Sequence, residues 1–144
     1  MKKSLLFFFV LIGTFELDAQ IGDEDHILGV WKSPNNSVMI KVDKMGNYYQ
    51  GRIVWLQSAD NVQPVLDTNN PEERLRKMPL KGNKVIQELS FDPSSFAWEG
   101  GTFYHHEEGK LYNCHIVLHD KDQLKITRFV NNRSEGIAEI WVRH

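Results

Sequence analysis

The chain has 144 residues, of which 41% are hydrophobic and 25% charged, and its formal net charge is −2 at pH 7. Non-specific binding to nucleic acid requires a basic field that this chain lacks, so we expect no nucleic-acid partner. Cys114 is the one cysteine. An internal disulfide is therefore excluded, and we expect this thiol to be a buried, small apolar side chain.

The N-terminal segment is typical of a secretory signal peptide. Two lysines precede an apolar run from Leu5 to Ile12, which is too short to span a bilayer because a transmembrane helix needs about 20 apolar residues. We expect cleavage after Ala19, so that residues 1–19 are removed and residues 20–144 form one domain. No later segment is long and apolar enough to span a membrane. The sequence thus predicts an exported protein, periplasmic or secreted, that is soluble and monomeric after cleavage.

Short β-forming stretches then alternate with polar turns. The predicted strands span residues 38–42, 48–56, 96–104, 111–118, 124–130 and 136–142. Repeats of about 10 to 14 residues with polar turns are typical of an antiparallel sandwich or barrel.

Alternation indicates which side of two strands faces the core. In the stretch 111–118 the better core face carries Tyr112, Cys114, Ile116 and Leu118. In the stretch 124–130 the apolar face includes Arg128, which we expect to lie at the rim with its charged end near water.

One long connection interrupts the strands, from Gln57 to Leu80. Asn70 is a suitable helix cap, Pro71 suits the first helical position, and acidic residues precede basic ones. The pattern predicts a helix of about two turns that ends at Pro79.

Several sequence blocks, in order, are distributed over essentially all of residues 20–144. They are Gly29-Val30-Trp31, Gly51–Leu56, Asp67–Pro71 with Leu80–Gly82, Trp98–Gly101 through Gly109–Tyr112, and Trp141-Val142-Arg143. In these blocks the chain resembles DUF2147, a family of exported bacterial proteins of unknown function. The resemblance implies an all-β fold, a small antiparallel up-and-down barrel of the lipocalin-like (calycin) type with about eight strands, and no established activity. His105-His106 stands where the family pattern often has Asp-Pro, a departure that affects a turn.

The barrel also has a physical rationale, with a β-sandwich as the alternative. Gly29 and Trp31 near the start, and Trp141 and Arg143 near the end, are placed to meet where a barrel closes. Gly29 permits a close approach of the backbone, Trp31 plugs one end, and Arg143 lays its guanidinium over the indole. Closure removes exposed strand edges.

The residues give no catalytic or metal-binding signature. His115 and His119 are four residues apart on a predicted strand, where they would be separated by roughly 13 Å, too far to share one ion at about 2 Å each. We expect no metal and no cofactor, and no catalytic residue can be nominated.

Two groups of residues are candidates for ligand binding. The polar side chains of the long connection either tie it to the barrel or form a lid in which Arg52 or Arg74 receives an anionic headgroup. The aromatic side chains either line a cavity or fill the barrel. The full candidate set is Trp31, Arg52, Trp55, Asp67, Asn69, Asn70, Arg74, Trp98, Tyr104, Tyr112 and Arg128.

On the basis of fold analogy, we expect a non-catalytic exported module that binds a small apolar or amphipathic, lipid-like ligand. A filled barrel that contacts an envelope protein partner is the first alternative. An unrecognised envelope hydrolase is the second.

Overall fold

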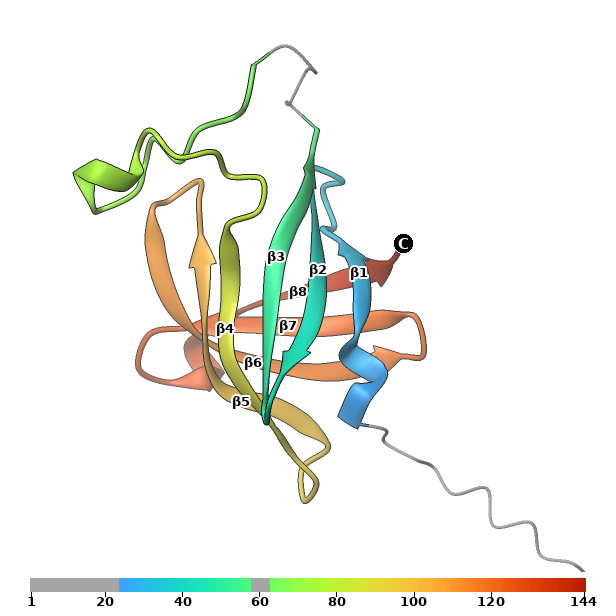
Figure 1. Cartoon of the computed structure of the whole chain (residues 1–144). Helices are drawn as coiled ribbons and strands as arrows, with labels where there is room; N and C mark the ends of the chain where they lie inside the picture. The colour runs from blue at the N-terminus through green and yellow to red at the C-terminus, as the bar shows by residue number, and fades with distance from the viewer. Residues whose placement is uncertain (1–23, 58–62) are drawn as a thin grey trace, which may run out of the picture.

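The computed structural model describes residues 24–57 and 63–144, so the expected signal peptide lies outside the described residues. Within the described part, eight antiparallel strands form a closed barrel in the order β1 to β8 (Figure 1). Their bounds are β1 Gly29–Lys32, β2 Val38–Met45, β3 Tyr48–Leu56, β4 Lys84–Asp92, β5 Ala97–His105, β6 Lys110–Asp120, β7 Gln123–Phe129 and β8 Ile137–Arg143. The predicted all-β up-and-down barrel is confirmed, and the sandwich alternative is wrong.

In most of these strands apolar and polar residues alternate. Because successive side chains of a strand face opposite sides, the apolar residues come together on the face toward the core. In β6, Cys114 and Ile116 are buried, and in β7, Leu124 and Ile126 are buried. The β2–β3 hairpin turns at Gly46, whose φ of +62° suits the tight turns that join antiparallel strands.

Strand β4 was not among the predicted strands. Its sequence buries Val85 and Ile86 next to each other and then Leu89, so it lacks a strict period of two. The interruption is a bulge: Glu88 has a φ of +59°, and the register with β3 shifts. A bulge moves subsequent side chains to the other face, which obscures the alternation on which strand prediction depends.

The barrel closes where the two ends of the domain meet. β1 pairs with β8, with Trp31 opposite Arg143. A single 3-10 turn, η1 (Glu24–Ile27), precedes β1 and covers the adjacent end of the barrel. Figure 1 shows η1 in blue beside the lower end of β1, whereas the 63–80 connection in green lies at the opposite end. We call the end at η1 the closed end.

The predicted two-turn helix in the long connection is wrong. The structure has only a 3-10 turn, η2 (Glu73–Leu75), and Pro79 instead forms a bridge with Leu66. Good capping residues do not stabilise a helix that has no apolar face to bury. No residue of η2 is buried, so no tertiary packing stabilises a helix longer than one turn in this segment.

Large side chains fill most of the core. Those less than 2% exposed are Trp31, Trp98, Tyr49, Ile27, Ile40, Ile53, Ile86, Leu89, Ile116, Leu124, Ile126 and Val42. Among residues 24–57 and 63–144, no helix has the length and apolarity needed to cross a membrane.

Candidate functional site

Trp31 and Arg143 join β1 to β8 at the closed end. The Arg143 guanidinium carbon lies 4.1 Å from the centre of the Trp31 ring. Its Nη1 and Nη2 donate to the carbonyls of Leu28 and His26 at 2.9 and 2.8 Å. Gly29 has a φ of +125°, which favours glycine, and a Cβ there would stand 2.8 Å from Nη1 of Arg143.

Hydrogen bonds to η1 seal the same end. The indole N–H of Trp31 donates to the Ile27 carbonyl at 2.7 Å, and that of Trp98 donates to Glu24 at 2.9 Å. Lys44 bonds the Asp25 carboxylate at 3.1 Å and, with the Tyr49 hydroxyl, holds the pKa of Asp25 below its usual value. These bonds leave Trp31 and Trp98 in the packed, closed half of the barrel.

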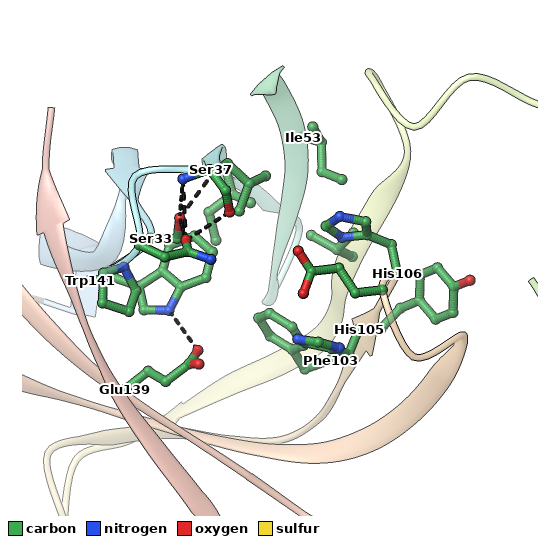
Figure 2. A pocket seen from close by; sticks show the side chains of 15 residues that line it. Ser33, Ser37, Ile53, Phe103, His105, His106, Glu139 and Trp141 are labelled. Atoms are coloured by element: carbon green, nitrogen blue, oxygen red, sulfur yellow. Dashed lines mark hydrogen bonds between the residues drawn. The ribbon is translucent and has the colours of Figure 1, made fainter. Parts of the chain in front are cut away.

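The opposite end contains a cavity, which we call the mouth cavity (Figure 2). Its empty space, including the part open to solvent, is about 470 Å³, and the centres of water molecules can occupy about 50 Å³ of it. Apolar side chains form its floor: Val38, Ile40, Ile53, Val85, Phe103 and Trp141. Polar side chains form its rim: Ser33, Asn35, Ser37, Tyr104, His105, His106, Glu107 and Glu139.

The β1–β2 connection forms a fixed part of the rim. The hydroxyls of Ser33 and Ser37 both donate to Oδ1 of Asn35 at 2.7 Å. The Ser33 oxygen in turn accepts the backbone N–H of Val38 at 3.1 Å. Because these groups bond one another, this side of the mouth is preorganised.

Glu139 is part of the cavity wall, and Arg128 lies behind it. Arg128 is 4% exposed, so the expectation that its charged end lies near water at the rim is wrong. Its Nη2 is 3.3 Å from Oε1 of Glu139. The Glu139 carboxylate also accepts from the indole of Trp141 at 3.4 Å, as Figure 2 shows. The rings of Phe103 and Tyr112 lie 5.6 and 5.4 Å from the guanidinium carbon.

The β5–β6 turn brings further titratable groups to the mouth. Nδ1 of His105 is 3.6 Å from a Glu108 oxygen, too long for a hydrogen bond. The Tyr112 hydroxyl donates to Glu108 and lowers the pKa of that carboxyl. Partial burial lowers the pKa of His106 below its ordinary value, which favours a neutral ring at the mouth.

The long connection is tied down across this end by a buried carboxylate. Asp67, 2% exposed, accepts from the Tyr104 hydroxyl at 2.8 Å and from the Asn70 amide at 2.7 Å. Burial and the bond to Asp67 raise the pKa of Tyr104 well above its usual range. The Asn69 amide donates to the Glu107 carbonyl at 2.9 Å. Asp67, Asn69 and Asn70 thus hold the connection to the barrel, as expected in the first of the two explanations above.

Three of the candidate ligand residues lie outside the barrel. Arg52 donates to the Gly82 carbonyl at 3.0 Å, and Arg74 pairs with Glu72 at 2.8 Å. Trp55 is 38% exposed on the outer surface. None of the three lines the mouth cavity, and neither arginine is placed to receive a headgroup there.

The cavity brings together Tyr104, from the candidate set, and Trp141, which we expected at the closing seam. Arg128 contacts the lining residues Glu139 and Phe103, and the ring of Tyr112 lies against its guanidinium. Sequence reasoning missed Phe103, His105, His106 and Glu139 as site residues. A signal existed for Glu139, because it lies two residues before Trp141 and is therefore in phase with a core residue.

Other chemistry has no support in the described residues. Among residues 24–57 and 63–144, no group of three or more His, Cys, Asp or Glu side chains is placed to hold a metal ion. Cys114 is a free, buried thiol whose pKa is raised by burial to about 12, so it is not an activated nucleophile.

A closed eight-stranded antiparallel barrel with one sealed end and one open, partly polar end defines a lipocalin-like protein. Residues 29–143 match the family described as uncharacterised proteins conserved in bacteria, DUF2147, and the chain belongs to this family. The barrel is similar to the solved structure of protein HP1028 from Helicobacter pylori, which is described as belonging to the lipocalin family. The TM-score is 0.71 and the sequence identity 16%, over 82% of each chain, a likeness that concerns the fold. No curated protein matches the chain in sequence.

Proposed function

We propose that the protein is an exported, non-catalytic binding module that takes a small amphipathic ligand at the mouth of its barrel. The observation that carries the proposal is the mouth cavity, with an apolar floor around Phe103 and Trp141 and a polar rim around His105 and Glu139. Small-molecule sites typically combine apolar walls with a few placed polar groups.

The size of the cavity limits the ligand. Pockets for drug-sized molecules typically have volumes of about 300–1,000 Å³. In the mouth cavity the volume open to the centres of water molecules is only about 50 Å³. Large side chains such as Trp31 and Trp98 occupy the deeper interior. We therefore propose a ligand with a short apolar part that enters the mouth, and a polar part that remains at the rim.

Export is the second element of the proposal. The apolar segment Leu5 to Ile12 and the expected cut after Ala19 support it. The denatured mass of the protein purified from a bacterial envelope should correspond to a chain that begins at Gln20. An uncleaved mass would contradict export through this signal.

The binding proposal is tested by titrating butanol, hexanol and octanol into isotopically labelled protein and following backbone amide shifts. We expect shifts to cluster at the β1–β2 connection and the β5–β6 turn. Affinity should rise with chain length until the apolar floor is covered.

Two neighbouring residues of β2 provide a matched pair of variants. Val38 faces the cavity and Met39 faces outward, since successive side chains of a strand alternate. Val38→Phe should block the mouth and abolish binding, whereas Met39→Phe should bind as the wild type does. If no alcohol binds the wild type, or if both variants bind equally, the mouth is not the site. The filled-barrel interaction protein would then be the better explanation.

A further inference from the structure

The most unusual group near the mouth is the Arg128 guanidinium. Within the described part of the chain, the buried side-chain atoms that lack a hydrogen-bond partner are Nδ1 of His105 and Nε and Nη1 of Arg128. Nε carries one N–H and Nη1 carries two, so three of the five donors of Arg128 have no acceptor. A buried charge with unmet donors is unfavourable unless something else supplies the acceptor.

The protein offers Arg128 little besides Glu139. Their 3.3 Å separation is long compared with the roughly 2.7–2.9 Å of a strong charge-assisted bond. The neighbouring ring of Tyr112 gives its hydroxyl to Glu108, and Phe103 has no polar atom to give. The guanidinium is thus held by aromatic packing, while the donors at Nε and Nη1 are buried without an acceptor.

Arg128 is also within reach of the mouth cavity. Glu139 and Phe103 both line that cavity and both contact Arg128, so the guanidinium lies directly behind the wall. The Glu139 side chain is 30% exposed. Its carboxylate can therefore turn toward water and give up its place at the guanidinium.

We propose that the ligand carries a carboxylate, which enters from the mouth, displaces Glu139 and accepts hydrogen bonds from Arg128. This inference rests on the proposed function, since it names the polar part of the same ligand. A planar guanidinium fits a carboxylate better than a single ammonium group would, because it offers parallel donors in a fixed fork. The apolar part of the ligand then lies against Phe103 and Trp141.

The rim also contains a feature that opposes this inference. Glu107 and Glu139 are the charged carboxyl side chains that line the cavity, and their field alone favours a cation. A decisive experiment must therefore compare headgroups of opposite charge on one chain length.

The experiment is calorimetric titration of hexanoate, hexanol and hexylammonium into the wild type, Arg128→Met and, as control, Arg133→Met. Arg133 lies in the exposed β7–β8 connection and does not line the mouth cavity. We expect hexanoate to bind the wild type and Arg133→Met about tenfold more tightly than hexanol, as hydrogen bonds to a charged group allow. In Arg128→Met this preference should disappear while hexanol still binds.

The outcomes separate the two proposals. Equal binding of hexanoate and hexanol would mean that Arg128 does not bind the headgroup of the ligand. Tighter binding of hexylammonium would mean that the rim carboxylates select a cationic headgroup. Either result overturns this inference and leaves the mouth as a binding site. Failure of all three compounds would overturn the proposed function itself. If Arg128→Met does not fold, the Nε–H resonance of Arg128 in the wild type replaces it. The chemical shift of that resonance should change on addition of hexanoate and not on addition of hexanol. A shift that changes with hexanol and not with hexanoate would contradict a carboxylate bound at Arg128.

Discussion

Trp31 is the residue on which closure of the barrel depends most. It is fully buried, donates its indole N–H to Ile27 and lies against the guanidinium of Arg143. We predict that Trp31→Ala lowers the free energy of unfolding by about 3–5 kcal/mol, the usual cost of removing a buried aromatic side chain. Urea denaturation measures the change.

Trp55 is the matched control for that prediction, since it is the same residue type on the outer surface, 38% exposed. Trp55→Ala should cost about 1 kcal/mol or less. Equal losses in the two variants would contradict a special role for Trp31 at the closed end.

His106 makes stability depend on pH near neutrality. Partial burial lowers its pKa in the folded protein below the ordinary 6.5, so the unfolded chain takes up a proton first as the pH falls. Where the unfolded state binds more protons, stability increases with pH. We therefore predict that the melting temperature decreases as the pH falls below 6.5.

A substitution separates this contribution from others. His106→Gln should reduce the decrease without abolishing it, because burial also lowers the pKa of His115. His119→Gln, at an exposed position, is the control for the loss of a histidine side chain as such. A profile that is the same in His106→Gln as in the wild type would rule out His106 as the source.

At the scale of elements, the contact between the long connection and the β5–β6 turn can be tested at a glycine. Gly109 has a φ of +61°, and a Cβ there would overlap the backbone carbonyl of Asn69. Gly46 has nearly the same φ, +62°, with nothing within 4 Å of a Cβ. The two glycines thus share a backbone conformation and differ in their surroundings.

We predict that Gly46→Ala costs about 1 kcal/mol from backbone strain alone. Gly109→Ala should cost clearly more, because the connection must move away from the turn. Hydrogen exchange should then accelerate in residues 63–80 in Gly109→Ala only. Equal costs and equal exchange would show that the connection is not held at this contact.

The elements that could be predicted from sequence are those in which local pattern and packing agree. In strands β6 and β7 alternation indicated the core faces correctly, since Cys114, Ile116, Leu124 and Ile126 are all buried. Strand β4 escaped prediction because its bulge at Glu88 interrupts the alternation. The helix in the long connection was predicted from its capping residue, its prolines and the order of its charges, and the segment had no apolar face to support it.

The candidate site was less predictable for a physical reason. Arg128 was noted as a charge on an apolar face, and Glu139 is likewise in phase with Trp141. Their meeting depends on the β7–β8 register, which places Ile126 opposite Glu139 and Arg128 opposite Ile137. The register of two such strands depends on the geometry of the connection between them and on the patterns of both, so the pattern of one strand does not contain it.

At the scale of the whole molecule, the barrel divides into a packed, sealed half and a half that opens at the mouth cavity. Hydrogen bonds from Trp31, Trp98 and Arg143 to η1 and the residue after it close one end. The Asp67–Tyr104 bond holds the long connection beside the other. Such a division suits a protein that presents one rigid opening to a small ligand.

Native mass spectrometry of the wild type and Val38→Phe, both purified from a bacterial envelope, tests that function most directly. We predict that the wild type carries an additional small mass that is lost on denaturation, and that Val38→Phe does not. The mass of the bound molecule would also show whether it has a short apolar chain and a carboxylate. Two bare proteins, or the same additional mass on both, would contradict a ligand site at the mouth of the barrel.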